Sequence, residues 1–520
     1  MPNLRSRERL ALLALVAFSM GAISACALEP EPTSTDALRP RIELTIDAGG
    51  EAVPVDPPWS TAASLTEKRI NHTMTALGSG KVIITGGNNF AAVGTTDLAI
   101  ATTEIRDPAT GTWGPAAPMT SPRLGHTATL LGNGKLLVVG GTVSGNQTGA
   151  LASAELYDPA TNTWAAVPSI AVARYGHEAA AVGPGKVLIL GGIDGSADML
   201  ASAELYDSAT NTWTAVPAMA TARATFTLTA LADGKLLVAG GKAKTLSSIA
   251  SAELYDPATN TWTATAPLHT SRYWHTATLL ESGKVLVAGG SNASDPVLSG
   301  GLKTTEIYDP LTGAWSPGAP LATERGDKHT ATRLANGGVL LTGGEPVPGT
   351  TAELYDPSAD AWIDAGTLAL NRDYSTASLL DDGSVLLAGG VSTGDSRICE
   401  RYTSGATGSP CTTPVECQSG SCISGACAAA PTSSASSGGG GSGGAGGATS
   451  TAVGASSTTA GAGGGASAQG GGDKVSACSV GGVAGRPSSS AGPWVALGVM
   501  IALRRRKVAI DSATASKRPA

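Results

Sequence analysis

Histidine and arginine, two residue types that can do chemistry, recur at a fixed distance along this chain of 520 residues. Five of the six histidines stand three or four residues after an arginine; they are His72, His126, His177, His275 and His329. A histidine could ligate a metal or transfer a proton, and an arginine could bind a carboxylate or phosphate. Such regular recurrence indicates architecture, so we expect these histidines to be structural and expect no metal, no cofactor and no catalytic residue.

The elements that position these residues belong to a repeat. A double glycine closes an aliphatic run seven times, at Gly86-Gly87, Gly140-Gly141, Gly191-Gly192, Gly240-Gly241, Gly289-Gly290, Gly343-Gly344 and Gly389-Gly390. A period of about 50 residues built from short strands is typical of radial repeat arrays. Each unit is expected to hold four strands, which in the third unit are a at residues 177–182, b at 186–190, c at 203–206 and d at 213–216.

The turns of the repeat support a meander of hairpins. The c–d turn reads Asp-Pro-Ala-Thr-Gly-Thr-Trp at residues 107–113, and the residue two before each tryptophan is Gly, Asn or Asp. These types tolerate positive φ, as expected after a type I turn. The a–b turns are glycine-containing too, so both connections predict tight hairpins.

The whole pattern resembles the kelch repeat: Arg-x-x-His, a hydrophobic run ending in Gly-Gly, Glu-Leu-Tyr-Asp-Pro and then Trp. This resemblance covers residues 59–402 and implies an all-β fold, a seven-bladed β-propeller with four-stranded antiparallel blades. Galactose oxidase shares that architecture, and its copper centre needs two histidines, two tyrosines and a cysteine crosslinked to one tyrosine. The propeller contains no cysteine before Cys399, so we expect no such oxidase chemistry.

The ring is expected to close with an N-terminal strand. The seventh unit has a c strand near residues 398–402 but no tryptophan after it. Trp59 lies ten residues before Arg69, as Trp262 lies ten before Arg272. Residues 59–65 are therefore predicted to form the outer strand of the last blade.

The repeated arginines leave two interpretations open. They are Arg69, Arg123, Arg174, Arg223, Arg272, Arg325 and Arg372, and each precedes an a strand. Either each pairs with a backbone carbonyl or an Asp of a neighbouring blade, or the ring forms an anion-binding funnel at one mouth of the channel. Beside them stand Tyr175, Tyr273, Trp274 and Tyr374, on the face that also carries the variable b–c loops. That face is where we expect binding.

The N-terminal segment predicts export. Residues 1–26 combine three arginines, an apolar stretch and Ile-Ser-Ala-Cys, which resembles a lipobox. Cys26 is the expected lipidation site, with an ordinary cleaved signal as the alternative. Residues 27–58 are rich in Pro, Glu and Thr and are expected to be a tether.

A small cysteine-rich segment at residues 403–430 follows the propeller. In an exported chain, Cys411, Cys417, Cys422 and Cys427 suggest disulfides, with three pairings possible and zinc as the rival. Cys399 makes a fifth candidate, so one partner stays open.

The C-terminal part consists of a Gly-, Ser- and Ala-rich linker and a tail. The linker, residues 431–477, cannot bury enough apolar area to fold. In residues 478–520, Cys478, the apolar run 491–503 and the basic cluster 504–507 resemble the myxobacterial C-terminal sorting tail. The run is shorter than the roughly 20 residues that span a membrane. Which of the two anchoring signals is used stays open.

These features predict a monomeric, non-enzymatic protein at the outer membrane or cell surface, attached by the lipid or the tail or released from it. It would bind a protein or glycan outside the cell through its b–c and d–a connections. A carbohydrate-active enzyme with a site in the channel and a passive envelope or matrix protein are the alternatives. The net charge of −7 argues against nucleic acid as a partner.

Overall fold

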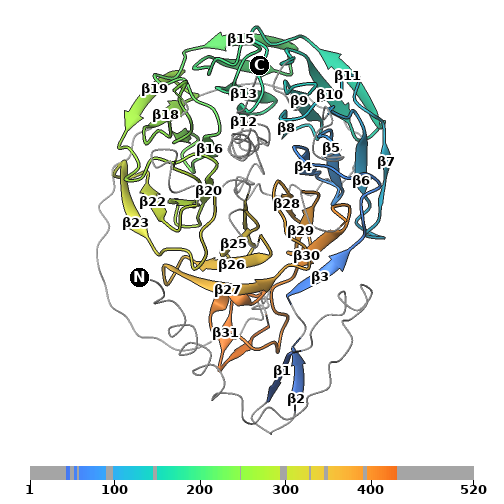
Figure 1. Ribbon diagram of the computed structural model, residues 1–520, viewed down its shortest axis with the longest axis vertical. Helices are drawn as coiled ribbons and strands as arrows, with labels where there is room; N and C mark the ends of the chain where they lie inside the picture. Colours follow the sequence, from blue (N-terminus) through green and yellow to red (C-terminus); the bar gives the residue numbers. More distant parts are fainter. Residues whose placement is uncertain are drawn as a thin grey trace, which may run out of the picture.

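The computed structural model describes residues 43–46, 52–55, 58–89, 98–144, 149–245, 247–292, 301–326, 329–344, 349–390 and 395–429. Seven four-stranded antiparallel sheets stand around a central axis, as Figure 1 shows. The predicted seven-bladed propeller is confirmed. In each sheet the strands follow one another in chain order from the axis outward, except in the seventh.

The blades have the following strands. Blade 1 holds β4 (Thr73–Ala76), β5 (Val82–Thr85), β6 (Thr103–Arg106) and β7 (Trp113–Ala116). Blade 2 holds β8 (Thr127–Leu130), β9 (Leu136–Val139), β10 (Ala154–Asp158) and β11 (Thr163–Val167). Blade 3 holds β12 (Glu178–Gly183), β13 (Lys186–Leu190), β14 (Ala203–Asp207) and β15 (Thr212–Val216). Blade 4 holds β16 (Thr227–Ala230), β17 (Leu236–Ala239), β18 (Ala252–Asp256) and β19 (Thr261–Thr265). Blade 5 holds β20 (Thr276–Leu279), β21 (Val285–Ala288), β22 (Thr305–Asp309) and β23 (Ala314–Gly318). Blade 6 holds β24 (Thr330–Arg333), β25 (Val339–Thr342), β26 (Thr351–Asp356) and β27 (Ala361–Thr367).

Blade 7 takes its outer strand from the front of the chain. It is built from β28 (Thr376–Leu379), β29 (Val385–Ala388), β30 (Cys399–Tyr402) and β3 (Trp59–Ala62). Trp59 pairs with Tyr402 in the antiparallel register, and their ring centroids lie 5.2 Å apart. The Trp59 indole N–H donates to the Ala365 carbonyl of blade 6 at 2.8 Å. The predicted closure of the ring by an N-terminal strand is therefore confirmed.

The core lies between neighbouring blades. The b strands, such as β9 and β13, are buried at both faces, because each sheet is covered by a blade on either side. Leu137 and Val139 of blade 2 pack with Val187 and Ile189 of blade 3 in one apolar cluster. This two-sided burial explains why the b strands read as unbroken aliphatic runs.

The c–d turns adopt the conformation that their sequence predicts. The residue two before the tryptophan has positive φ in six blades: Gly111, Asn162, Asn211, Asn260, Gly313 and Asp360. In blade 2 the Asn162 side chain accepts a hydrogen bond from the Tyr157 hydroxyl at 2.9 Å and from the Ala117 amide of blade 1 at 3.0 Å. The turn residue thus fixes its own hairpin and contacts the preceding blade.

The double glycine lets one blade approach the next. Both Gly86 and Gly87 have positive φ, and a Cβ on Gly86 would lie 2.4 Å from the Arg123 carbonyl oxygen of blade 2. The Gly87 N–H donates to that same carbonyl at 2.9 Å. Equivalent bonds link every blade to the next, including Gly390 of blade 7 to Arg69 of blade 1. Any side chain at these positions would force the blades apart.

Two smaller elements lie outside the ring. The strands β1 (Glu43–Ile46) and β2 (Ala52–Val55) pair as an antiparallel hairpin inside the predicted tether. The cysteine-rich segment holds the 3-10 helix η2 (Pro414–Glu416) and the strands β31 (Cys422–Ile423) and β32 (Ala426–Cys427). Within the described parts of the chain, no helix has the length and apolar character needed to cross a membrane.

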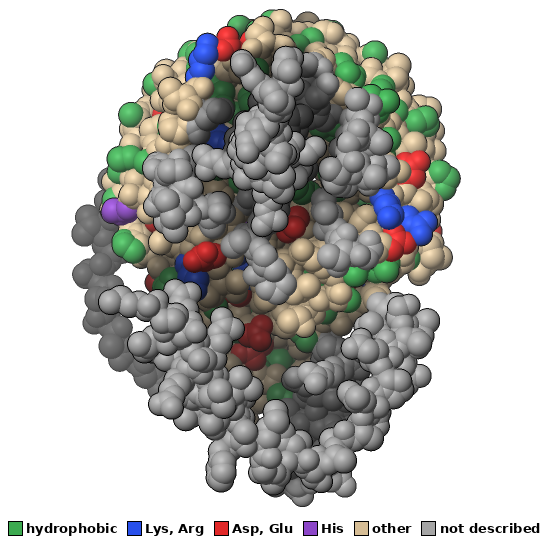
Figure 2. Space-filling view, viewed as in Figure 1, with side chains coloured by type: hydrophobic (Ala, Val, Ile, Leu, Met, Phe, Trp, Pro, Cys, Tyr) green, Lys and Arg blue, Asp and Glu red, His purple; other side chains and the backbone are tan. Residues whose placement is uncertain are grey.

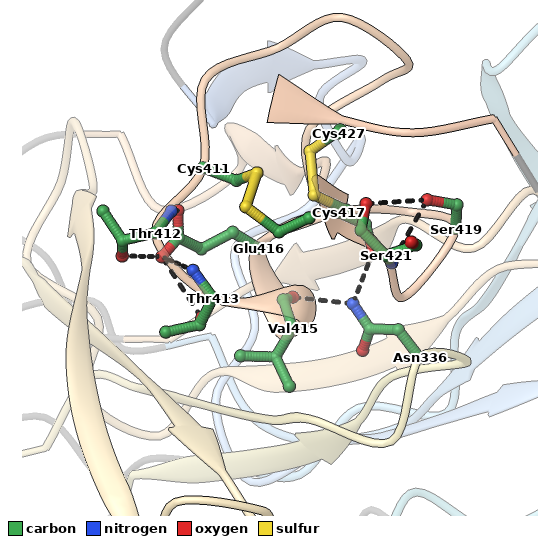
Figure 3. Close-up of a disulfide and its surroundings, with 11 residues drawn as sticks. Asn336, Cys411, Thr412, Thr413, Val415, Glu416, Cys417, Ser419, Ser421 and Cys427 are labelled. Carbon is green, nitrogen blue, oxygen red and sulfur yellow. Dashed lines mark hydrogen bonds between the residues drawn. A yellow bond between two sulfur atoms is a disulfide. The ribbon is translucent and has the colours of Figure 1, made fainter. Parts of the chain in front are cut away.

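The cysteine-rich segment is packed against the propeller. Val415 joins the apolar cluster between blades 6 and 7, beside Leu334 and Leu354. The Asn336 side-chain amide, from the a–b turn of blade 6, donates to the Val415 carbonyl at 2.6 Å and the Cys417 carbonyl at 2.9 Å (Figure 3). This segment is thus part of the folded body.

Candidate functional site

One end of the propeller carries the described parts of the b–c and d–a connections. Their backbones meet in short bridges: Tyr273 pairs with Ser291, and Ala224 pairs with Lys242. The opposite end carries the near-identical a–b and c–d turns. We call the first end the loop face, and the predicted binding residues belong to it.

The repeated arginines lie at the loop-face end of the blades, and their side chains are buried. All seven are at most 1% exposed, and each guanidinium contacts a glutamate of strand c in its own blade at 2.6 to 3.2 Å. The glutamates are Glu104, Glu155, Glu204, Glu253, Glu306, Glu353 and Glu400. Arg123 also donates to the carbonyl oxygens of Gly140 and Ser153 at 2.7 and 3.1 Å. Each arginine therefore ties strands b and c to the segment that enters strand a.

This geometry decides between the two interpretations of the arginines. An anion-binding funnel requires guanidinium groups that a ligand can reach, whereas these are enclosed and paired. The funnel interpretation is therefore wrong for Arg69, Arg123, Arg174, Arg272, Arg325 and Arg372. The structural interpretation holds for the backbone carbonyls, to which every one of these arginines donates, but the acidic partner is a glutamate of the same blade and not an aspartate of a neighbour.

Burial and pairing act in opposite directions on these groups. Burial lowers the pKa of Arg123, and hydrogen bonding to Glu155 partly offsets it. Burial alone would raise the pKa of Glu155, but hydrogen bonds from the Thr120 amide and from Arg123 outweigh it and lower that pKa. Both partners thus remain charged, which a buried pair requires.

The repeated histidines join adjacent blades. His72 Nε2 lies 2.7 Å from Thr376 Oγ1 of blade 7, and His177 Nε2 lies 2.9 Å from Thr127 Oγ1 of blade 2. His126, His275 and His329 make the same kind of contact with the preceding blade. Burial, followed by the charge of Arg69, lowers the pKa of His72 to about 3. These imidazoles are neutral spacers between blades.

Of the predicted aromatic site residues, two are exposed in part and two are not. Tyr175 and Tyr374 are 1% and 3% exposed, and burial raises the pKa of Tyr175 to about 12. Tyr273 and Trp274 are half-buried, with ring centroids 4.9 Å apart and planes inclined at 57°. The structure therefore brings one aromatic pair, both from blade 5, to the loop face.

Lys242 completes this pair and was missed by the sequence reasoning. It follows Gly241 in blade 4, and its ammonium lies 4.2 Å from the Tyr273 ring centroid and 5.2 Å from that of Trp274. Such contacts hold a cation over an aromatic face. The signal was present, because lysine stands where blade 2 has Thr142 and blade 3 has Ile193. We call Lys242, Tyr273 and Trp274 the blade 4–5 cluster.

In most blades, one residue directly before the innermost strand has a left-handed backbone conformation. The residue two after the arginine has φ between 54° and 64° at Asn71, Gly125, Gly176, Thr225, Trp274 and Tyr374. Neighbours in this series are hydrogen-bonded: the Gly125 amide donates to Asn71, the Gly176 amide to Gly125 and the Trp274 amide to Thr225. Threonine, tryptophan and tyrosine are disfavoured in this conformation, so blades 4, 5 and 7 carry backbone strain that blades 2 and 3 avoid with glycine.

The cysteines of the small segment are paired. Cys411 is bonded to Cys422 and Cys417 to Cys427 (Figure 3), which selects one of the three possible pairings. Cys399 is a free thiol on β30, fully buried, and burial raises its pKa to about 12. Of the five disulfide candidates it is the one that stays unpaired, because it belongs to the packed interior of blade 7. The predicted lipidation site Cys26 and the sorting residue Cys478 lie outside the described residues.

The space-filling view shows how sparse charge is on the side drawn in Figure 2. Among the residues drawn in colour, lysine, arginine and acidic side chains lie in small scattered groups. Among the described histidines His269 is the exposed one. Its Nδ1 lies 3.0 Å from Glu306, the partner of Arg272.

Comparison with known families matches the repeat. The family described as the KLHDC2/KLHL20/DRC7 Kelch-repeats domain matches residues 71–290 and, in an overlapping alignment, residues 125–344. Together the two alignments cover more than half of the chain.

Individual relatives are more distant. Galactose oxidase from Gibberella zeae is 32% identical over 92 residues, which are 18% of this chain and 13% of that protein. A solved structure, described as a novel fungal alcohol oxidase of the AA5 family in complex with copper, superposes with a TM-score of 0.53 at 17% identity, covering 66% of this chain and 76% of that one. The structure of YjhT gives a TM-score of 0.45 at 15% identity, covering 58% and 99%. At such identities the structural likeness concerns the fold alone.

The donor atoms that the copper-containing relative would suggest are not gathered in the described residues. The group of cysteine, histidine and acidic side chains that could hold a metal there is Cys411, Cys417 and Cys427, all of which are in disulfides. The repeated histidines lie in separate blade interfaces, and Cys399 is fully buried. These residues do not fit a copper centre.

Proposed function

Because the chain belongs to the kelch-repeat family of β-propellers, we propose that it is an extracellular binding module that holds a protein or glycan on its loop face. The observation that carries the proposal is the blade 4–5 cluster. At these positions the blades differ from one another, and this sector combines two half-buried aromatic rings with an ammonium, whereas the aromatic residues at these positions in blades 3 and 7, Tyr175 and Tyr374, are buried.

The rest of the molecule supports a division between a structural scaffold and a binding face. The arginine, histidine and double-glycine positions are all used to join strands and blades. The opposite end carries tight turns of nearly constant sequence. Variable segments on a rigid scaffold are the usual place for recognition. A site on the loop face would therefore be held in position by the whole ring.

The setting of the module follows from the ends of the chain. We propose that Cys26, as a lipidated N-terminus, and the tail with Cys478 attach the propeller to the outer membrane or cell surface. The ligand would then meet the propeller outside the cell. A net charge of −7 favours a partner other than nucleic acid.

The proposal is tested by screening the purified chain on a glycan array and by pull-down from surface extracts. Any ligand found should protect amides of the loop face from hydrogen exchange, and the c–d turns at the opposite end are the internal control. Failure to retain any ligand in both screens, or protection confined to the c–d turns, would contradict the proposal.

A further inference from the structure

We propose that the blade 4–5 cluster is a subsite for a uronate residue of an acidic glycan. This inference rests on the function proposed above and names the ligand class and the sector of the loop face that receives it. It combines an unfavourable backbone conformation, a platform of aromatic rings with a cation, and a rim of short polar groups.

Two residues of this sector have a backbone conformation that is disfavoured for their residue types. Trp274 has φ of 54°, as has Thr225 next to it, and the Trp274 amide donates to the Thr225 carbonyl at 3.1 Å. In blades 2 and 3 the same position is Gly125 and Gly176, which adopt the conformation without strain. Strained non-glycine residues cluster at ligand sites, where the side chain they place is needed.

The side chains offer a surface that fits a charged sugar ring. Tyr273 and Trp274 present inclined aromatic faces, against which the C–H groups of a pyranose can pack. Lys242 holds its ammonium over both rings, where it can bind a carboxylate as a compact positive charge. The Trp274 Nε1 is buried and has no hydrogen-bond partner in the described chain, so a ligand oxygen that reached it would satisfy this donor.

The rim of the cluster consists of short hydroxyl and amide groups. The Ser248 hydroxyl donates to Asn292 Oδ1 at 3.0 Å and lies 2.8 Å from the Ser271 hydroxyl. Asn292 directly follows Ser291, which is paired with Tyr273 by two backbone hydrogen bonds. Such groups can exchange hydrogen bonds with sugar hydroxyls. Aromatic faces for the C–H groups of a ring, a cation for a carboxylate and short groups for hydroxyls together match the parts of a uronate sugar.

Blade 2 shows which residues the repeat has at these positions when the cluster is absent, and so provides the substitutions for an experiment. At the positions of Tyr273 and Trp274 it has Leu124 and Gly125, and at the position of Lys242 it has Thr142. The variant Lys242→Thr/Tyr273→Leu/Trp274→Gly therefore replaces the cluster with the residues that blade 2 has at the same positions, which the repeat already accommodates. Asn71→Gly, at the equivalent position of blade 1, is the control outside the cluster.

Binding of galacturonate and alginate hexasaccharides, with cellohexaose as the neutral comparison, is measured by calorimetry on the full chain. The wild-type protein should bind the uronate oligosaccharides more weakly as salt is raised, because exposed charges are screened. The triple variant should lose at least about tenfold in affinity. Lys242→Thr alone should remove the preference for uronate over the neutral sugar, and Asn71→Gly should change neither.

The outcomes separate this inference from the function proposed above. Equal binding of the uronate sugars by the triple variant and the wild type would overturn the subsite and leave the loop-face function standing. Wild-type binding confined to neutral glycans, or to proteins and acidic peptides, would do the same. Absence of any ligand in the screens would remove both. Urea denaturation of each variant shows whether a loss of binding reflects a loss of folding.

Discussion

Acid should weaken this propeller steeply between pH 7 and pH 5, because five histidines are buried between blades in the neutral form. Burial, followed by a neighbouring arginine, lowers the pKa to about 3 for His72 and His177 and to about 4 for His329. The pKa values of His126 and His275 also lie well below the usual range, with burial as the main cause. In the unfolded chain a histidine has a pKa of about 6.5.

The sign and size follow from proton linkage. Between the folded and the unfolded pKa the unfolded chain binds more protons, so acid favours unfolding. The stabilisation is complete above the unfolded pKa, is lost as the pH falls through about 6.5, and continues to fall until the folded pKa is reached. From pH 7 to pH 5 each histidine should cost about 2 kcal/mol, and the five together about 10 kcal/mol. That loss is comparable to the whole stability of a typical domain.

The measurement is urea denaturation followed by tryptophan fluorescence at pH 7, 6 and 5. With a slope of about 3 kcal/mol per molar urea, the midpoint should fall by about 3 M over this range. Carboxylates whose pKa is lowered, such as Asp158 beside Lys135, titrate below this window and do not contribute to the change within it.

The chain contains its own control for this prediction. In blade 4 Phe226 stands where five of the other six blades have histidine (blade 7 has Ser375), and it contacts the glycine of the preceding blade in the same way as His177 does. His177→Phe should therefore fold and should reduce the loss between pH 7 and pH 5 by about 2 kcal/mol. An unfolding free energy that stays constant over this range, or an unchanged pH dependence in His177→Phe, would refute the reasoning.

Two further predictions concern how the ring is held. Trp59→Ala, which removes a buried indole from the closing strand, should cost about 3 to 5 kcal/mol of unfolding free energy in urea denaturation, and a change below 1 kcal/mol would mean that β3 does not close the ring. Glu155→Gln leaves the Arg123 charge buried without its partner and should cost about 3 to 5 kcal/mol, whereas Arg123→Met/Glu155→Leu should recover most of this loss. A fully stable Glu155→Gln protein would show that the pair is dispensable.

Local chemistry explains why so much of the fold could be predicted. The turn residues before each tryptophan and the double glycines are dictated by backbone conformation within a few positions, so the sequence states them directly. Trp59 was assignable because its distance from Arg69 repeats that of Trp262 from Arg272. The seventh unit lacks a tryptophan-containing d strand of its own, so the strand that begins at Trp59 could be assigned to it.

The site residues were harder, because their surroundings are assembled by tertiary contacts. Arg123 meets Glu155 only when strands b and c are side by side, and that contact turns an expected surface cation into an interior one. The recurrence of a glutamate in all seven units was visible, and it was the signal that could have indicated the pairing. Lys242 and Trp274 come from different blades, so their proximity needs the complete ring.

The seam between blades 7 and 1 differs from the other seams only in its outer layer. Near the axis it has the links found at most other seams: His72 contacts Thr376, and the Gly390 amide donates to Arg69. At the rim, the tryptophan indoles of the other blades donate to a carbonyl of the preceding blade, as Trp164 does to Ala117. Trp113 donates to no backbone carbonyl in the described chain and packs near the buried Cys399 instead. The join between the first and last blades therefore combines these inner links with β3, which supplies the outer strand of blade 7 and is bonded to blade 6 through Trp59.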